Sequence, residues 1–127
     1  MAYLLDTHTF LWMRHAPDRL SERASAVCGE AATELTMSLA SAWEMAIKLS
    51  IGKLRLSEPL RDVLVDARKR GITSLAITEA HVLRVRELPL HHRDPFDRIL
   101  AAQALEEGMT LLSADAVFDG YAVPRLW

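Results

Sequence analysis

The chain alternates between two hydrophobic periodicities, and this alternation limits the folds it can adopt. Short apolar runs of strand type occur at residues 3–5, 33–38, 72–77 and 109–113. Stretches with helical spacing lie between these runs. Strands that alternate with helices predict an α/β fold with a mainly parallel sheet of about five strands, right-handed connections and helices on both faces. The last strand is expected at an edge, within residues 122–127, because Pro124 cannot donate a ladder hydrogen bond.

Composition indicates one globular domain spanning residues 1–127, because half of the 127 residues are hydrophobic. The net charge of -2 excludes an overall basic field, so any contact with nucleic acid must come from a local patch. Cys28 is the only cysteine, which excludes an intrachain disulfide. No apolar run approaches the roughly 20 residues that span a bilayer, and the start of the sequence lacks signal-peptide features. We therefore expect a cytoplasmic protein.

One predicted helix begins with two acids. Asp94 is a good N-cap and Gly108 a stop, so the helix should run between them. Its apolar residues fall on one arc: Leu100, Ala101, Ala104 and Leu105. Asp97 lies at the middle of that arc, where desolvation penalises a charge unless a partner or a metal ion is present. The helix dipole accounts fully for Asp94 and only in part for Asp97, so we assign Asp97 a functional role and Asp94 a structural or supporting one.

Three further acids lie at the ends of predicted strands or early in a helix. Asp6 and Asp115 each follow a buried strand, and Glu44 lies on a helix that follows another. Asp6 fits a helix cap or a turn as well as it fits a functional role. Glu44 has three structural interpretations: a capping box with Ser41, an ion pair with Lys48, or simple exposure. Considered alone, Glu44 is better explained as structural.

Taken together, the four acids predict a metal site. In a parallel sheet the ends of the strands and the starts of the following helices share one rim. Asp6 and Asp115, at strand ends, should therefore converge there with Glu44 and Asp97, which are expected in the first turns of their helices. Four acids without basic partners repel one another, and a hard divalent cation such as Mg²⁺ or Mn²⁺ resolves the repulsion. Such an ion attracts a phosphodiester and activates water. The neighbouring His91 and His92, by contrast, are a weak metal pair and predict a solvated loop.

Five segments carry a family resemblance: Tyr3–His8 (YLLDTH), Ser41–Lys48 (SAWEMAIK), His91–Ala104 (HHRDPFDRILAAQA), Leu111–Phe118 (LLSADAVF) and Val123–Trp127 (VPRLW). In order and spacing they resemble the PIN-domain ribonucleases, specifically the VapC-type toxins of type II toxin–antitoxin modules. The likeness covers nearly the whole chain. It implies a three-layer PIN-like fold.

The resemblance also assigns roles to individual residues. It implies that Asp6, Glu44, Asp97 and Asp115 are the catalytic, metal-binding quartet, and it raises Glu44 from a structural residue to a ligand. Ser113 stands where many relatives carry threonine, and either hydroxyl can bond to a carboxylate or a water. Ser113 and Asp94 are therefore candidates for supporting the ligands. Asp119 lies outside this set.

The family implies a Mg²⁺-dependent endoribonuclease, with Mn²⁺ as a substitute, that is frequently a homodimer and is inhibited by a small antitoxin. The run Phe10–Met13 has more large apolar side chains than one helix stripe can bury, so part of it is predicted to form a groove for the antitoxin or a second protomer. Two alternatives are a non-catalytic interaction domain of the same fold and a Mg²⁺-binding receiver. A response-regulator receiver needs two adjacent acids after its strand, and here Asp6 has no acidic neighbour. A haloacid-dehalogenase-type phosphatase needs a second acid at the position of His8.

Overall fold

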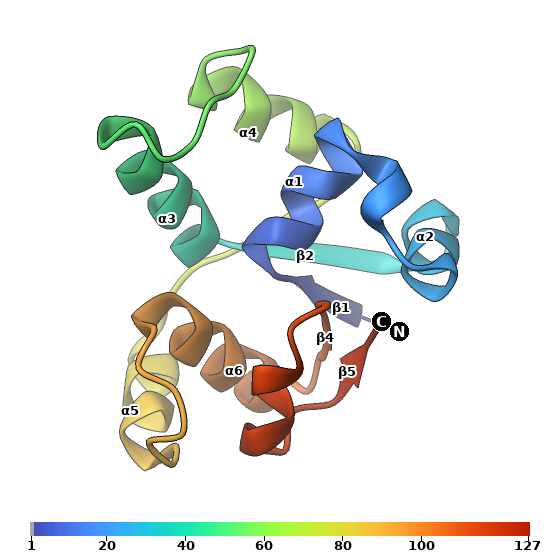
Figure 1. Ribbon diagram of the computed structural model, residues 1–127. Helices are drawn as coiled ribbons and strands as arrows, with labels where there is room; N and C mark the ends of the chain where they lie inside the picture. The colour runs from blue at the N-terminus through green and yellow to red at the C-terminus, as the bar shows by residue number, and fades with distance from the viewer. Residues whose placement is uncertain (1) are drawn as a thin grey trace.

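The computed structural model describes residues 2–127 (Figure 1). The strands are β1 (Ala2–Leu5), β2 (Glu34–Ser38), β3 (Thr73–Leu75), β4 (Thr110–Leu112) and β5 (Arg125–Leu126). The α-helices are α1 (Thr7–His15), α2 (Glu22–Gly29), α3 (Leu39–Ser50), α4 (Leu60–Lys69), α5 (Glu79–Glu87) and α6 (Pro95–Glu107). Two 3-10 helices complete the fold, η1 (Pro17–Arg19) and η2 (Ala116–Tyr121). Each predicted strand is present, although β3 and β4 are shorter than the apolar runs that contain them.

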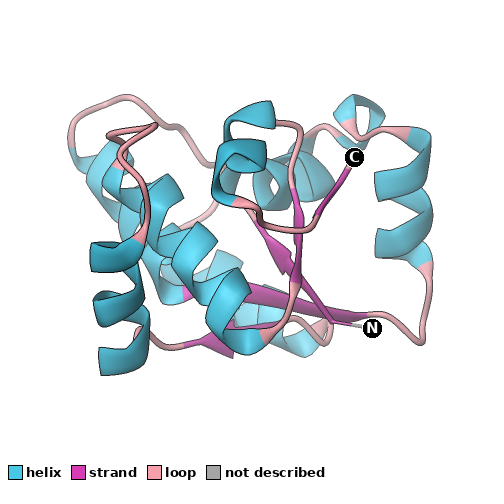
Figure 2. Ribbon diagram, turned by 90° about the horizontal axis from the view of Figure 1, so that it is seen from below, coloured by secondary structure: helices cyan, strands magenta, loops and turns pink. Residues whose placement is uncertain are grey.

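The five strands form one parallel sheet in the order β3-β2-β1-β4-β5. β1 lies at the centre, where Leu4 pairs with Thr36 of β2 on one side and with Leu111 of β4 on the other. All four pairings are parallel, which requires crossover connections, and helices cover the sheet on both sides (Figure 2). The predicted α/β fold with a parallel five-stranded sheet is therefore confirmed.

Neighbouring residues of the central strands supply two separate cores. Leu4 and Leu111 pack into a core with residues of α6 and η2, whereas Leu5 and Leu112 pack into a second core with residues of α1, α3 and α4. All four leucine side chains are fully buried. This alternation follows from the pleat, which directs successive side chains to opposite faces. The continuous apolar runs in the sequence are thus explained by strands buried on both faces.

The ends of α6 are those predicted. Asp94 is the N-cap, and its Oδ1 accepts hydrogen bonds from the backbone N–H groups of Phe96 (2.8 Å) and Asp97 (3.1 Å). Pro95 occupies the first helical position, where its missing N–H costs nothing. Gly108 ends the helix in the left-handed conformation (φ 65°), which glycine adopts without a steric penalty.

The start of α1 matches one of the two roles predicted for Asp6, and the start of α3 differs from the prediction. Asp6 is the N-cap of α1, and its Oδ1 accepts from the N–H of Thr9 at 2.7 Å. In α3 the N-cap is Ser38, so Glu44 lies in the second helical turn and not in the first. Glu44 is therefore one turn farther from the sheet rim than predicted.

One apolar face of α3 is not part of either core. The buried side chains of α3 include Ala40 and Met45, while Trp43 is 59% exposed and Ile47 is 36% exposed. The Trp43 ring makes an edge contact with Phe96 of α6, with 5.2 Å between ring centroids. Despite such exposed apolar side chains, none of the helices within residues 2–127 is both long and apolar enough to cross a membrane.

Candidate metal-binding and catalytic site

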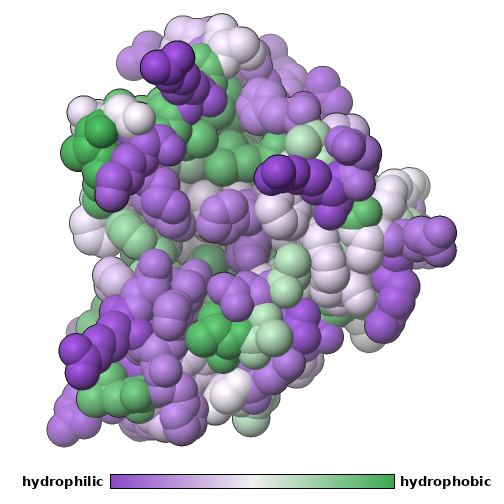
Figure 3. Space-filling model, viewed as in Figure 1, coloured by the Kyte–Doolittle hydropathy of each residue, from purple (hydrophilic) through white to green (hydrophobic). Residues whose placement is uncertain are grey.

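The candidate site lies at the rim where strands end and helices begin. Asp6 follows β1 directly, and Asp115 lies three residues beyond the end of β4. Figure 1 shows the starts of α1 and α3 facing α6 across the middle of the molecule. The surface is hollowed in this region, and hydrophilic side chains prevail there (Figure 3). This is the edge of a parallel sheet at which α/β proteins bind their ligands.

Asp6 is held by two uncharged donors. Its carboxylate is 6% exposed, and Oδ1 accepts from the N–H of Thr9 while Oδ2 accepts from the hydroxyl of Ser113. The same hydroxyl accepts the backbone N–H of Asp115 at 3.1 Å. Ser113 thus connects Asp6 to the loop of Asp115. Among residues 2–127 no basic side chain bonds to Asp6, so these donors fix the carboxylate without neutralising its charge.

Glu44 is buried (7% exposed) and has two side-chain partners. The hydroxyl of Thr7 donates to Oε1 at 2.6 Å, and the ammonium of Lys48 donates to Oε2 at 2.6 Å. Of the three structural interpretations, the pair with Lys48 is correct, while the capping box with Ser41 and simple exposure are wrong. The expectation that the four acids have no basic partners is therefore wrong for Glu44. Residues four apart on a helix are neighbours, which brings Lys48 within reach.

Asp97 carries the clearest electrostatic signal of the site. Its side chain is 25% exposed, and Oδ2 lies 2.8 Å from Nε2 of His92. Burial raises the pKa of Asp97 from 3.8 to about 6, the hydrogen bond from His92 opposes that rise, and the charges of Asp94 and Asp115 add to it. The carboxyl groups of Asp94 and Asp115 are thus close enough to repel Asp97. A cation bound here would relieve both the desolvation and the repulsion.

His92 is a residue of this site that the sequence did not indicate. The prediction of a solvated loop is wrong for His92, because its ring forms a hydrogen bond with Asp97 and its backbone carbonyl accepts hydrogen bonds from other residues. The hydroxyl of Tyr121 donates to the carbonyl of His92 at 3.2 Å, and the guanidinium of Arg98 donates to the same carbonyl at 3.5 Å. Arg98 and Tyr121 lie on separate elements, so no local pattern in the sequence predicts these contacts. His91 instead lies against Tyr121, with 6.0 Å between the ring centroids.

The predicted acids are connected but do not form one tight cage. Within residues 2–127, the group whose possible ligand atoms all lie within 4.8 Å of one another consists of His92, Asp94 and Asp97. The four predicted acids form no group of that kind among the described residues. This spacing fits Mg²⁺, which usually binds one or two carboxylates directly and keeps several waters. The oxygen donors of the rim therefore suit a hydrated hard cation.

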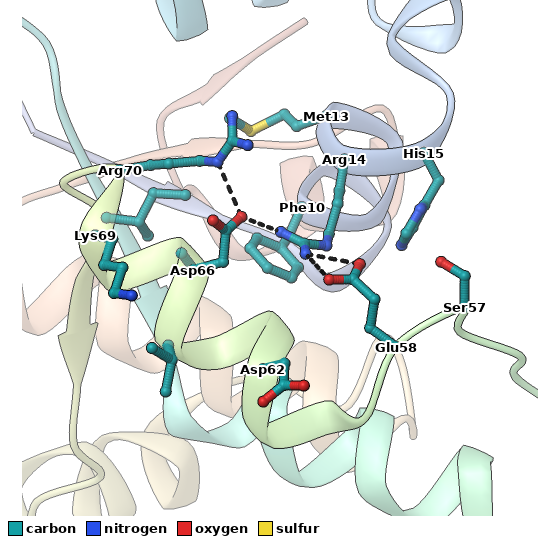
Figure 4. Close-up of a pocket in the computed structure, with 13 residues that line it drawn as sticks. Phe10, Met13, Arg14, His15, Ser57, Glu58, Asp62, Asp66, Lys69 and Arg70 are labelled. Atoms are coloured by element: carbon teal, nitrogen blue, oxygen red, sulfur yellow. Dashed lines mark hydrogen bonds and ion pairs between the residues drawn. The ribbon is translucent and has the colours of Figure 1, made fainter.

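A larger groove elsewhere has the opposite electrostatic character. It has a volume of about 670 Å³, lies between α1 and α4, and is lined in part by Phe10 and Met13 (Figure 4). Arg14 bonds to Glu58 at 2.8 Å and to Asp66 at 2.6 Å. The hydrogen bonds to Asp66 from Arg14 and from Arg70, the residue that follows α4, lower the pKa of Asp66. Glu58 and Asp66 therefore have cationic partners in this groove, whereas Asp62, which also lines it, forms no ion pair within residues 2–127.

Comparisons with known proteins agree with this description. The PIN domain family profile matches residues 3–124. Ribonuclease VapC22 from Mycobacterium tuberculosis is 30% identical over 123 residues, covering 96% of this chain and 93% of that relative. The fold superposes on VapBC2 from Rickettsia felis, solved with a DNA fragment from its promoter (TM-score 0.73, 16% identity, 99% of this chain and 98% of that one). It also superposes on VapBC-1 from nontypeable Haemophilus influenzae (TM-score 0.67, 19% identity, 99% and 97%).

Proposed function

Because this chain belongs to the PIN-domain family, we propose that it is a single-domain, metal-dependent endoribonuclease, residues 1–127, that acts as the toxin of a toxin–antitoxin module. The observation that carries this proposal is the accumulation of carboxyl groups around Asp97, with a pKa raised to about 6 by burial and by neighbouring acids. Perturbed acids of this kind gather at functional sites. The 30% identity to a ribonuclease over nearly the full length supports the substrate class.

We assign metal binding and catalysis to Asp6, Glu44, Asp97 and Asp115, with Mg²⁺ as the ion and Mn²⁺ as its substitute. Ser113 and Asp94 orient these ligands, the first through Asp6 and the second as the cap at the start of α6. The donor set supports this assignment, since carboxylate oxygens suit hard divalent cations. A bound ion of this kind would activate water for attack on a phosphodiester and stabilise the charge that develops on phosphate.

The protein side chains supply position and charge in this mechanism. Asp6 is fixed by a backbone N–H and by Ser113, so it is pre-organised before substrate arrives. Glu44 is oriented by Thr7, and its ion pair with Lys48 involves a lysine side chain that is 36% exposed. If a divalent cation were bound beside Glu44, the ammonium group of Lys48 could turn to solvent or to an RNA phosphate.

We also propose that the active form is a homodimer. An apolar groove of about 600 Å³ adjoins the candidate site and is lined in part by Trp43, Phe96 and Leu90, of which Leu90 is 81% exposed. Exposed apolar surface that several side chains share is typical of interaction sites. Leu90→Ser should shift the sedimentation equilibrium toward monomer, because it removes apolar area from the groove. Ile51→Ser is the matched control, since Ile51 is 58% exposed and does not line the groove. A dimer that survives Leu90→Ser unchanged would rule out this face.

For the antitoxin we propose the groove between α1 and α4. The prediction that part of the run Phe10–Met13 forms a partner groove is supported by Phe10 and Met13, which line this one. Trp12 instead packs against Trp127, with ring centroids 5.8 Å apart. Met13→Ala should therefore weaken the complex with the proposed antitoxin. We propose that this activity is cytoplasmic, as an RNA substrate and such a partner require.

The test of the proposed activity is RNA cleavage by the purified, antitoxin-free protein. We expect cleavage of single-stranded RNA with Mg²⁺ or Mn²⁺ and none in EDTA, with recovery when the ion is restored. Undiminished cleavage in EDTA would contradict the metal-dependent mechanism. Failure of the folded protein to cleave any RNA with either ion would instead favour a non-catalytic interaction domain of the same fold.

A further inference from the structure

The cluster at the start of α6 contains a nitrogen donor that the proposed acidic quartet does not use. Possible ligand atoms of His92, Asp94 and Asp97 all lie within 4.8 Å of one another. We propose that these three residues together bind a nitrogen-preferring divalent transition-metal ion such as Zn²⁺. This site extends the proposed function, on which it rests only in sharing Asp97 with the quartet.

The distances suit joint coordination of one ion. Nε2 of His92 and Oδ2 of Asp97 are 2.8 Å apart. Two ligands that bind one ion at about 2.1 Å in tetrahedral geometry are separated by about 3.4 Å, so an ion can replace the shared proton when these two atoms move apart by less than about 1 Å. Asp94 uses Oδ1 for both cap hydrogen bonds. Its Oδ2 has no hydrogen-bond partner among residues 2–127 and is free to act as the third ligand.

Hydrogen bonds to the backbone fix the segment that carries His92. The carbonyl of His92 accepts from the hydroxyl of Tyr121 at 3.2 Å and from the guanidinium of Arg98 at 3.5 Å. Arg98 in turn donates to the carbonyls of Pro89 (2.8 Å) and Val85 (3.0 Å), so it connects this loop to α5. Supporting contacts of this kind orient a ligand and reduce the entropy lost on metal binding. The side chain of His92 remains 31% exposed, which leaves a path for the ion.

The nitrogen donor changes which ion the site prefers. Imidazole suits Zn²⁺ and other late transition metals, whereas Mg²⁺ prefers oxygen ligands and waters. The positive end of the α6 dipole opposes a cation, but two carboxylates adjoin this helix start and outweigh that partial charge. Zn²⁺ bound by His92, Asp94 and Asp97 would remove Asp97 from the quartet. We therefore expect Zn²⁺ to inhibit cleavage supported by Mg²⁺.

The experiment is calorimetric titration of the full chain, without an affinity tag, with Zn²⁺ and separately with Mg²⁺. His92→Asn should weaken Zn²⁺ binding by at least about 10-fold and weaken Mg²⁺ binding much less, because only Zn²⁺ uses the ring nitrogen. His91→Asn is the matched control and should bind both ions like the wild type, since His91 is not in the cluster.

Asp6→Asn separates this site from the proposed catalytic one, because Asp6 is not among the three ligands. We expect it to lose RNA cleavage and to keep Zn²⁺ binding. If His92→Asn binds Zn²⁺ as tightly as the wild type, the inference is overturned, and the proposed function stands. If RNA cleavage does not depend on a metal ion, and His92→Asn still loses affinity for Zn²⁺, the proposed function is overturned and this inference stands.

Discussion

Two acid-rich regions of this molecule differ in how their charges are balanced. In the groove between α1 and α4, Arg14 neutralises Glu58 and Asp66, and the pKa of Asp66 is lowered. At the sheet rim, Asp97 lies near other carboxyl groups and its pKa is raised to about 6. The first region is a cavity of about 670 Å³, yet Glu58 and Asp66 in it are paired with a cation of the protein itself. We therefore place the proposed metal ion where carboxyl groups repel one another and not where the cavity is.

The two regions also differ in how their acids are fixed. The ion pairs of Arg14 connect α1 with α4 and the loop before it, so they belong to the packing of helices. At the rim, Asp6 is fixed by Thr9 and Ser113, which are uncharged. Uncharged donors orient a carboxylate and preserve its charge for a ligand. Substitutions in the first region should therefore change stability, and substitutions in the second should change activity.

The largest expected effect comes from exchanging an acid for its amide in each region. Asp6→Asn should reduce RNA cleavage by at least about 100-fold, because it removes a proposed metal ligand and with it several kcal/mol of charge stabilisation. Asp66→Asn is the matched control and should cleave within about twofold of the wild type. The measurement is the single-turnover rate of cleavage of one RNA by each variant. If both variants lost cleavage rate equally, the proposed difference between the two regions would be wrong.

Ser113→Ala should give a smaller loss at the rim. The change removes a donor to Asp6 and the acceptor for the N–H of Asp115, so both acids lose their orientation. We expect about 10-fold slower cleavage, in the range seen when groups that orient metal ligands are removed. Ser113→Thr keeps the hydroxyl and should restore most of the rate. A threonine variant as slow as the alanine variant would show that the hydroxyl is not responsible.

In the free toxin, Arg14→Met should change stability and leave cleavage unchanged. It leaves Glu58 and Asp66 without this arginine, and we expect a small loss in the free energy of unfolding because both acids are partly exposed. Urea denaturation at low and high salt measures this, and the loss should shrink as salt screens the charges. Slower cleavage by the folded variant would indicate that the groove also contributes to the activity.

Much of the fold follows from local sequence patterns. The runs that end at Leu5 and Leu112 are apolar throughout because both faces of a parallel sheet are buried. Asp94 and Gly108 mark the ends of α6 because capping is a local interaction. The exception is Trp43, which lies on the apolar face of α3 and is exposed, because a helical pattern does not say whether the chain itself or a partner covers that face.

The candidate site was less accessible to sequence reasoning, because its contacts join distant elements. Thr7 and Glu44 meet across 37 positions, and Ser113 and Asp6 across 107. Adjacent histidines gave no reason to prefer His92, whose position depends on Arg98 and Tyr121. The acids could be predicted to share a rim from topology. Their individual partners depend on packing that no short motif contains.

The most direct test of the central claim is a set of melting curves of the wild type and Asp97→Asn, in EDTA and in Mn²⁺, between pH 4 and pH 8. The folded-state pKa of Asp97, about 6, lies above the unfolded value of 3.8, so the folded protein holds more protons in this interval and loses stability as pH rises through it.

Asp97→Asn escapes this penalty. In EDTA above pH 6 it should melt at or above the wild-type temperature, with an advantage on the order of 1–2 kcal/mol that disappears toward pH 4. Mn²⁺ should stabilise it less than the wild type, because one proposed ligand is gone. A variant that melts below the wild type in EDTA at pH 7, yet keeps the full stabilisation by Mn²⁺, would contradict the account and make Asp97 a residue that only serves the α6 dipole.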